Sequence, residues 1–379
     1  MTCLPALRNG GANGGRLTVG ASRKRIIAAV PLARDRPLWE LTVVDGLAGG
    51  QVGFVVKIHH SLADGGAAVA LLMNAFVVDD ADAVIEPFHL EPVPSARELY
   101  RMAAPNVVGS LASIPALGLQ TVRGLRNRRA ARRRESVPVL GAFAGPRTSF
   151  NVSLTPERTF AMLTLSIEAM TSAKRFAGTS LNDVFLALCA GGLRRYLGRT
   201  GDLPRTSLVA SVPVATEADG TRLSGNHVDN LFVPLHTHVD DPVARLQAIH
   251  ASASAARRVR TALGNGLFEQ RAGLVPPLLY TAATRSWAAT RLANRVRPPL
   301  NLVASSVKGP RTPLELDGGL ITALYSSGPI LEGIGLNITA WSYLDTLYVS
   351  LLGCPSSLPD PWLLADDITA EMAALPAST

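Results

Sequence analysis

Short apolar runs alternate with longer amphipathic stretches along most of this chain, and this pattern predicts both strands and helices. Strands are expected within residues 36–46 and 52–58, where apolar and β-branched residues are bounded by turn-forming ones. An Ala/Leu-rich helix is expected at 66–76, directly after the second strand. A connector rich in Pro, Asp and Glu follows at about 79–95 and separates this first section from the rest of the chain.

A long helical region is expected from about 96 to 135, with interruptions near Pro105 and Pro115. It ends in a cluster of seven arginines between residues 123 and 134. An amphipathic helix with a basic end suits a membrane surface. A linker helix that packs on the protein and leaves its basic end in solvent has the same pattern, so both interpretations stay open.

A second series of strands and helices begins near residue 148. Strands are expected at 159–167, 207–214, 231–235, 301–306, 335–340 and 346–352, and helices at 180–197, 240–260, 265–297 (with breaks) and from 360 onward. Strands and helices that interleave in this way predict an α/β protein with mixed sheets and two lobes.

Composition narrows the class of protein. The chain has 379 residues, of which 47% are hydrophobic and 17% charged, and it is long enough for two domains with sizeable cores. Its three cysteines, Cys3, Cys189 and Cys354, are too scattered for a disulfide framework and fit a reducing cytoplasm. We expect no transmembrane helix, because no stretch of 18 or more apolar residues occurs, and no signal peptide in the first 30 residues.

The basic character of the chain is local. Without the seven arginines of residues 123–134, the net charge falls from +8 to +1. A protein that binds nucleic acid needs a broader basic face with aromatic or motif support. We therefore expect no nucleic-acid partner.

The run from His59 to Gly65, His-His-Ser-Leu-Ala-Asp-Gly, carries the candidate chemistry. It lies where a strand gives way to a helix, so only one histidine can point into a given cleft. A neutral imidazole can remove a proton near pH 7, since its unperturbed pKa is about 6.5. Asp64 is placed to cap the helix, and it could also pair with an arginine and fix the loop. The pattern indicates acyl transfer.

Two other interpretations of this run remain. The histidine pair could simply close a tight turn through hydrogen bonds. His60 and Asp64, four residues apart, could ligate a metal, although the remaining histidines are too scattered to supply a clear third ligand. Serine chemistry is not expected, because the chain has no Gly-x-Ser-x-Gly motif around Ser61. Phosphate-binding and dinucleotide-binding glycine motifs are also missing from the sequence.

From about residue 31 to 375 the chain resembles the bacterial wax ester synthase/diacylglycerol acyltransferase family, in the style of a mycobacterial member. The motifs that carry the resemblance, besides the His-His run, are Pro37-Leu38-Trp39, Pro146-Arg147-Thr148, Phe150-Asn151, Asn182-Asp183, Val212-Pro213-Val214, Gly225-Asn226, Asn301-Leu302-Val303, Gly335-Leu336-Asn337-Ile338-Thr339 and Asp360-Pro361-Trp362.

The resemblance implies two chloramphenicol-acetyltransferase-like lobes with the active site between them. It implies transfer of a fatty acyl group from acyl-CoA to diacylglycerol, or to a long-chain alcohol in wax ester synthesis, without a metal or a further cofactor. Carried over by motif, His60 is the general base and His59 its neighbour. Asp64 anchors the loop, Gly65 allows the turn, and Asn182 is a candidate for orienting the substrate or the oxyanion.

The chain departs from the family near its start, because members usually carry a longer segment before Pro37-Leu38-Trp39. We therefore expect a poorly ordered 1–30, an incomplete first lobe at 31–95, a helical linker at 96–147 and a second lobe at 148–379. An incomplete lobe leaves open that the chain is an inactive, lipid-binding homologue. The expected location is the cytoplasm, at the inner face of the plasma membrane or on lipid droplets where the protein associates with lipid.

Overall fold

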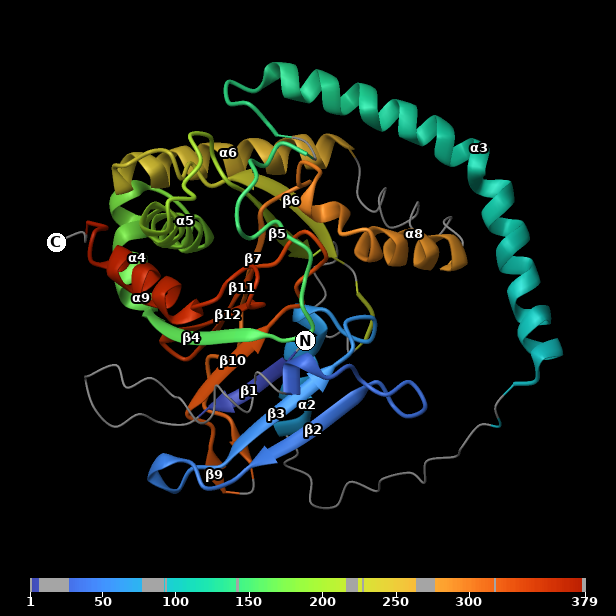
Figure 1. Cartoon of the computed structure of the whole chain (residues 1–379), viewed down its shortest axis with the longest axis horizontal. Coiled ribbons are helices and arrows are strands. Elements are labelled where there is room, and N and C mark those ends of the chain that lie inside the picture. Colours follow the sequence, from blue (N-terminus) through green and yellow to red (C-terminus); the bar gives the residue numbers. More distant parts are fainter. Residues whose placement is uncertain are drawn as a thin grey trace.

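Two sheets and the helices that cover them form the body of the protein, seen in the computed structural model in Figure 1. The structure describes residues 2–6, 27–76, 92, 94–140, 143–215, 224–226, 228–263, 277–316 and 318–376. The larger sheet is mixed and the smaller one is antiparallel. The predicted mixed α/β architecture is confirmed, with the mixed pairing confined to one of the two sheets.

The smaller sheet joins segments from opposite ends of the sequence. Its strand order is β10-β1-β3-β2, and its bounds are β1 (Thr2–Ala6), β2 (Trp39–Val44), β3 (Gly53–Ile58) and β10 (Ala323–Ser327). This differs from the expected domains in two ways. Thr2–Ala6 forms a paired strand instead of a poorly ordered tail, and β10 leaves the second section of the chain to pair with β1. Residues 7–26 lie outside the described part.

Helix α2 (Gly65–Phe76) follows β3, where the Ala/Leu-rich run predicts a helix. Its buried residues Ala67, Ala68 and Leu72 contact side chains of the larger sheet, including Phe160 and Trp341, in one apolar cluster. This cluster joins the two sheets, so the loop that leads into α2 is held between them.

The larger sheet has the strand order β4-β12-β11-β7-β5-β6. Its bounds are β4 (Thr159–Ser166), β5 (Val209–Ala215), β6 (Val228–Pro234), β7 (Leu302–Val307), β11 (Asn337–Tyr343) and β12 (Thr346–Gly353). Each strand expected in the second section is present. Neighbouring residues of β4 and β11 alternate between two apolar clusters, because successive side chains of a strand face opposite sides.

Four helices cover the outer face of the larger sheet (Figure 1): α4 (Ile167–Ala177), α5 (Leu181–Thr200), α6 (Pro242–Leu263) and α9 (Pro361–Met372). The α5 helix begins with a capping box, in which Ser180 and Asp183 each bond the backbone N–H of the other. Adjacent glycines let α5 and α9 approach closely, since a Cβ on Gly192 would lie 2.4 Å from Ile368 Cγ1. The largest apolar cluster fills the space between these helices and the sheet.

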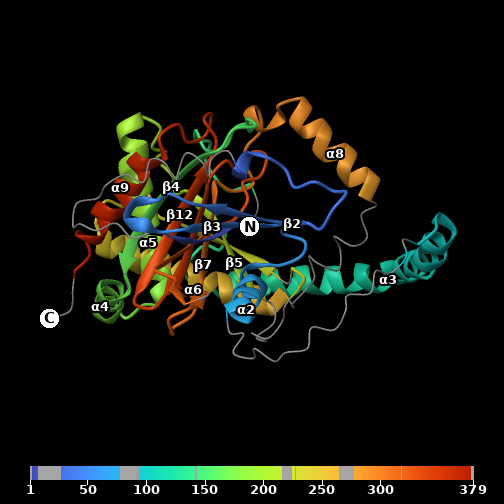
Figure 2. The same ribbon diagram turned by 90° about the horizontal axis from the view of Figure 1, so that it is seen from below.

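Helix α3 (Ala96–Arg134) is continuous, although Pro105 and Pro115 lie inside it. It begins with a capping box between Ser95 and Glu98. Figures 1 and 2 show a curved helix whose C-terminal end lies along α6 while its N-terminal half extends away from the body. The expected interruptions are therefore absent from this helix. The helix that contains the two prolines is curved instead of broken.

The remaining elements are short or peripheral. They are the hairpin β8 (Glu315–Leu316) and β9 (Gly319–Leu320), the 3₁₀ turns η1 (Ala48–Gly50) and η2 (Leu292–Asn294), and helix α8 (Pro277–Ala289). In the described residues no single helix is long and apolar enough to cross a membrane. Helices α4 and α5 would pass that test together, but they meet at 101° and α5 is largely buried.

Candidate active site

A cavity of about 260 Å³ lies between the two sheets, at the end of β3. Its walls come from the His-His loop, from strands β5, β6, β7 and β11, and from the end of β10: His60, Gly65, Pro213, Asn226, Val228, Asn230, Val303, Ser305, Val307, Ser326, Gly328, Pro329, Leu331, Asn337, Thr339 and Trp341. The wall thus combines residues that lie more than 200 positions apart in the sequence.

His60 is the one described histidine that lines this cavity. Its Nδ1 lies 3.2 Å from the carbonyl oxygen of Ala63. A carbonyl can only accept a hydrogen bond, so Nδ1 carries the proton and donates it. Nε2 is then the basic nitrogen of the ring, and it can accept a proton from a group bound in the cavity.

His59 turns away from the cavity and is exposed. Its Nδ1 accepts the backbone N–H of Ser61 at 3.2 Å and lies 2.7 Å from the Ser61 hydroxyl. The two histidine side chains therefore point in different directions and make different contacts, as expected for neighbours at the end of a strand. The His59 ring stabilises its own loop, whereas the His60 ring faces the space between the lobes.

Asp64 is buried and caps α2, because its Oδ1 accepts the backbone N–H of Ala67 at 3.0 Å. The loop before it is joined to the 224–226 segment by backbone hydrogen bonds. Asp64 N donates to the Gly225 carbonyl at 3.1 Å, and Gly225 N donates to the Leu62 carbonyl at 2.7 Å. The anchoring role expected of Asp64 thus has a clear geometric basis, and the loop is anchored to both lobes.

Gly65 acts differently from the expectation that it allows the turn. It is the first residue of α2 and does not have the positive φ that favours glycine. A Cβ at this position would lie 2.9 Å from Cγ2 of Val307 on β7. Gly65 instead permits the close approach of α2 to the larger sheet, and its backbone conformation is one that other residues can adopt.

The wall opposite the His-His loop is a hydrogen-bonded group on β11. Asn337 Nδ2 donates to the Pro329 carbonyl at 3.1 Å, and the Thr339 hydroxyl donates to Asn337 Oδ1 at 2.6 Å. Gly328 N donates to the same hydroxyl at 3.2 Å. Asn337 and Thr339 have no role predicted from the sequence. Polar residues two apart in an apolar strand share one face, and that spacing could have placed Asn337 and Thr339 together.

Asn182 is not brought to this cavity. It lies in the first turn of α5, on the outer face of the larger sheet, and it is not among the cavity-lining residues. Its neighbour Asp183 is buried and bonded to His250 at 2.7 Å. Burial raises the pKa of Asp183, but hydrogen bonds from His250 and Ser180 and the charge of Arg257 outweigh it, so the pKa is lowered. The position of Asn182 does not support the substrate-orienting role expected of it.

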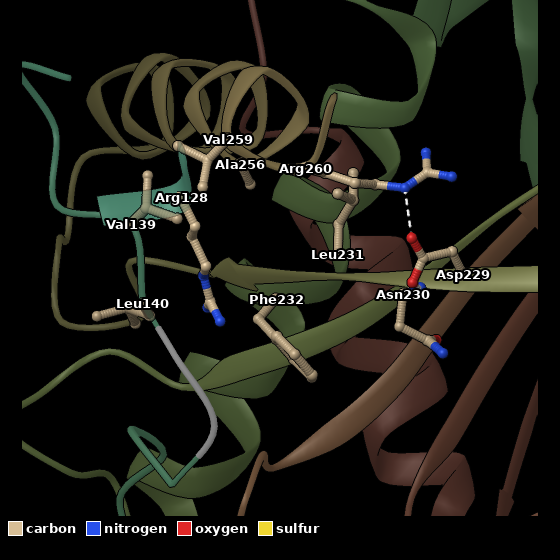
Figure 3. A pocket seen from close by; sticks show the side chains of 10 residues that line it. All are labelled: Arg128, Val139, Leu140, Asp229, Asn230, Leu231, Phe232, Ala256, Val259 and Arg260. Carbon is tan, nitrogen blue, oxygen red and sulfur yellow. Dashed lines mark hydrogen bonds and ion pairs between the residues drawn. The ribbon is translucent and has the colours of Figure 1, made fainter. Parts of the chain in front are cut away.

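A second cavity, of about 60 Å³, adjoins the outer edge of β6 (Figure 3). It is lined by Arg128 of α3, by residues of α6 and by Asn230, which also lines the larger cavity. In Figure 3 Arg260 pairs with Asp229, at 2.7 Å. This space is much smaller than the cavity of about 260 Å³ at His60, and no histidine of the described residues lines it. The cavity at His60 is therefore the candidate active site.

Comparison with protein families shows which family this chain belongs to. The model described as "Wax ester synthase/diacylglycerol acyltransferase catalytic domain" matches residues 14–185, and "WS/DGAT C-terminal domain" matches residues 224–376. The chain belongs to the wax ester synthase/diacylglycerol acyltransferase family. The resemblance given by the sequence motifs is confirmed, and the His-His loop lies within the matched catalytic domain of this family.

Relatives and solved structures agree with this assignment. Two Mycobacterium tuberculosis proteins, both named provisionally as diacylglycerol O-acyltransferases, are similar over most of the chain. Rv0221 is 37% identical over 92% of this chain and 72% of its own length, and Rv3740c is 33% identical over 86% and 71%. The family enzyme of Marinobacter aquaeolei VT8 superposes with a TM-score of 0.61 at 26% identity, covering 96% of this chain and 77% of that one.

The fold extends beyond the family. The starter condensation domain of rhizomide synthetase matches 97% of this chain and 76% of its own, with a TM-score of 0.52 at 14% identity. At this identity the likeness concerns the fold alone. It agrees with the expected two-lobed, chloramphenicol-acetyltransferase-like architecture.

Proposed function

We propose that this protein transfers a fatty acyl group from acyl-CoA to the free hydroxyl of diacylglycerol, forming triacylglycerol. The observation that carries the proposal is the His60 ring, whose Nδ1 is bonded to the Ala63 carbonyl and whose other nitrogen is free to act as a base on the cavity. Membership of the acyltransferase family and the names of the mycobacterial relatives support this reaction.

His60 acts as the general base in this reaction. Nε2 removes the acceptor's hydroxyl proton while the oxygen attacks the thioester carbonyl carbon. The tetrahedral intermediate then collapses, the carbon–sulfur bond breaks, and the CoA thiolate takes the proton back from the imidazolium. The thioester supplies the driving force, so the reaction requires no covalent acyl-enzyme.

The test is an assay of purified protein with labelled palmitoyl-CoA and either dioleoylglycerol or hexadecanol. We expect labelled triacylglycerol from the wild type and at least ~100-fold slower formation from His60→Ala. If wax ester were the only product, the acceptor would be a long-chain alcohol and not diacylglycerol, and the proposed acyl-transfer chemistry would stand. Failure with every hydroxyl acceptor, in a folded protein that still binds diacylglycerol, would instead favour the inactive, lipid-binding homologue.

We further propose that the protein works at an anionic lipid surface. Apolar side chains are exposed along the N-terminal half of α3 and on α8, among them Tyr100 (78%), Met102 (64%) and Leu278 (84%). Both helices extend from the same end of the molecule in Figures 1 and 2. Arginines at the C-terminal end of α3 would attract anionic headgroups. Diacylglycerol partitions into lipid, so such contact would bring the acceptor to the enzyme.

A further inference from the structure

Two hydrogen-bond donors in the wall of the His60 cavity have no partner among the residues that the structure describes. They are the indole Nε1–H of Trp341 on β11 and the hydroxyl of Ser326 on β10. Both residues are fully buried, with 0% of their surface exposed. A buried polar group without a partner costs about 1–3 kcal/mol, so such groups are rare unless a ligand satisfies them.

Trp341 and Ser326 line the same cavity as His60. Trp341 is paired in register with Val307 of β7, the residue that Gly65 contacts directly after the His-His loop. Trp341 also shares the cavity-facing side of β11 with Asn337 and Thr339, since the three alternate along the strand. Asn337 and Thr339 use their polar groups on each other and on nearby backbone, whereas Trp341 does not.

The chemistry of the Trp341 and Ser326 donors indicates what kind of ligand they bind. An indole N–H can only donate, so its partner must be an acceptor. The Ser326 hydroxyl can rotate to donate as well. Both groups are uncharged and fully buried, and Trp341 belongs to an apolar cluster. Burying a charged ligand without a counter-charge is costly, so this environment disfavours a free phosphate or carboxylate and favours a carbonyl oxygen.

We propose that Trp341 Nε1–H and Ser326 Oγ–H bind the carbonyl oxygen of the acyl thioester and stabilise the oxyanion that forms there; this rests on the acyl transfer proposed above. When the acceptor oxygen bonds to the carbonyl carbon, the π electron pair moves to the carbonyl oxygen between the two donors, and the acceptor proton moves to His60. The pair returns to re-form the carbonyl as the CoA thiolate leaves. In this proposal Trp341 and Ser326, and not Asn182, orient the substrate and stabilise the oxyanion.

The test uses Trp341→Phe, which removes the donor and keeps an aromatic ring, and Ser326→Ala. Loss of one such donor typically lowers kcat by about 10²–10³-fold. We expect each variant to lower kcat at least ~10-fold with a small change in KM. Ser326→Ala should unfold in urea at the wild-type concentration or a higher one, whereas Trp341→Phe should lose some stability, because the smaller ring leaves a cavity at a fully buried position. A purely structural role would instead leave the kcat of both folded variants unchanged.

Tyr343→Phe is the matched control, on the same face of the same strand. The Tyr343 hydroxyl is already used, since it accepts from Leu314 N and donates to the Ile321 carbonyl, both at 2.9 Å. Tyr343 does not line the cavity. We expect this variant to lose stability while its kcat stays at the wild-type value. Wild-type kcat in both Trp341→Phe and Ser326→Ala would overturn the proposal.

A binding measurement separates this proposal from the reaction itself. The probe is a ketone analogue of palmitoyl-CoA in which a methylene group replaces sulfur, titrated into His60→Ala protein with ¹⁵N-labelled tryptophan. We expect a downfield shift of one indole N–H signal, lost in the Trp341→Phe background, even if no hydroxyl acceptor is ever acylated. Binding of the analogue without that shift would refute the carbonyl site.

Discussion

Gly65 of the His-His loop and Val307 of β7 pack so closely that a Cβ on Gly65 would lie 2.9 Å from Val307 Cγ2. This contact fixes α2, and with it His60, relative to the larger sheet. We expect Gly65→Ala to push the loop from β7, lowering kcat/KM by about tenfold for a misplacement of a few tenths of an ångström and stability by ~1 kcal/mol. Steady-state kinetics and urea unfolding would measure both effects.

The neighbouring glycine gives the control for this prediction. A Cβ on Gly66 would meet only Asp64 Oδ1, at an ordinary 3.5 Å, so Gly66→Ala should leave kcat/KM unchanged. Val307→Ala in the Gly65→Ala background removes the methyl groups that the new Cβ would meet, and should restore activity. Equal losses in both glycine variants would show that the loop, and not the contact with Val307, is sensitive to an added methyl group.

The His60 and His59 side chains should respond very differently to removal. We expect His60→Ala to lower kcat by about 10²–10⁴-fold, because a positioned general base contributes this much. His59→Ala loses only contacts to Ser61 on an exposed loop, so its kcat should fall by no more than a few-fold. Circular dichroism would verify that both variants fold. An equally inactive, folded His59→Ala protein would contradict the assignment of the base.

Much of the fold was accessible from local sequence signals. The strand and helix around the His-His run, the Ser180–Asp183 cap and the Asp360 cap follow from periodicity and capping chemistry, which operate over a few residues. The pairing of β10 with β1 was not accessible, because it joins residues more than 300 positions apart and no local pattern specifies the partner of a strand. The continuity of α3 through Pro105 and Pro115 was likewise missed, since proline predicts a break more often than a curve.

Some residues of the candidate site could likewise be predicted from local sequence signals, and others could not. His60 and Asp64 belong to one contiguous motif, so the sequence predicted both. Trp341 and Ser326 lie on separate strands and look like ordinary core residues in the sequence. Only the assembled cavity shows that their donors lack partners within the described part of the chain. Asn182 was chosen from a family motif, but the helix that carries it covers the opposite face of the sheet.

Asp64 should matter more for stability than for chemistry. Loss of a helix N-cap costs typically about 1 kcal/mol, and Asp64 caps α2 through Ala67 N. We expect Asp64→Ala to lower the free energy of unfolding by ~1–2 kcal/mol and Asp64→Asn, which can still cap, to lower it by less than half as much. Urea titrations monitored by tryptophan fluorescence would decide. Equal losses in the two variants would show that the cap itself contributes little.

Lipid binding by the projecting helices can be measured by vesicle sedimentation. Replacing Arg129, Arg132, Arg133 and Arg134 with Gln should weaken binding to vesicles containing phosphatidylglycerol, by ~1 kcal/mol per arginine at the surface, and leave binding to neutral vesicles unchanged. Leu278→Ser with Tyr280→Ser should weaken binding to both kinds, because these side chains are exposed and uncharged. Unchanged binding in both variants would favour the linker helix with a solvated basic end.

Two glycines of α5 should show how tightly the second lobe is packed, one beside Glu371 of α9 and one in open space. A Cβ on Gly191 would lie 2.3 Å from Glu371 Oε1, and Glu371 is a fully enclosed partner of Arg245 and Arg195. Gly191→Ala should therefore lower the free energy of unfolding by about 2–4 kcal/mol, since it both overpacks the interface and disturbs a buried ion pair.

Gly198 supplies the opposite case in the same helix, because nothing lies within 4 Å of a Cβ built there. Gly198→Ala should raise the free energy of unfolding by about 0.5–1 kcal/mol, the usual gain of alanine over glycine inside a helix. Chemical unfolding of both variants tests the pair. The sign is the discriminating result: if Gly191→Ala also stabilised the protein, α9 would have room to move away from α5, and the close contact of these helices would not limit the stability of the second lobe.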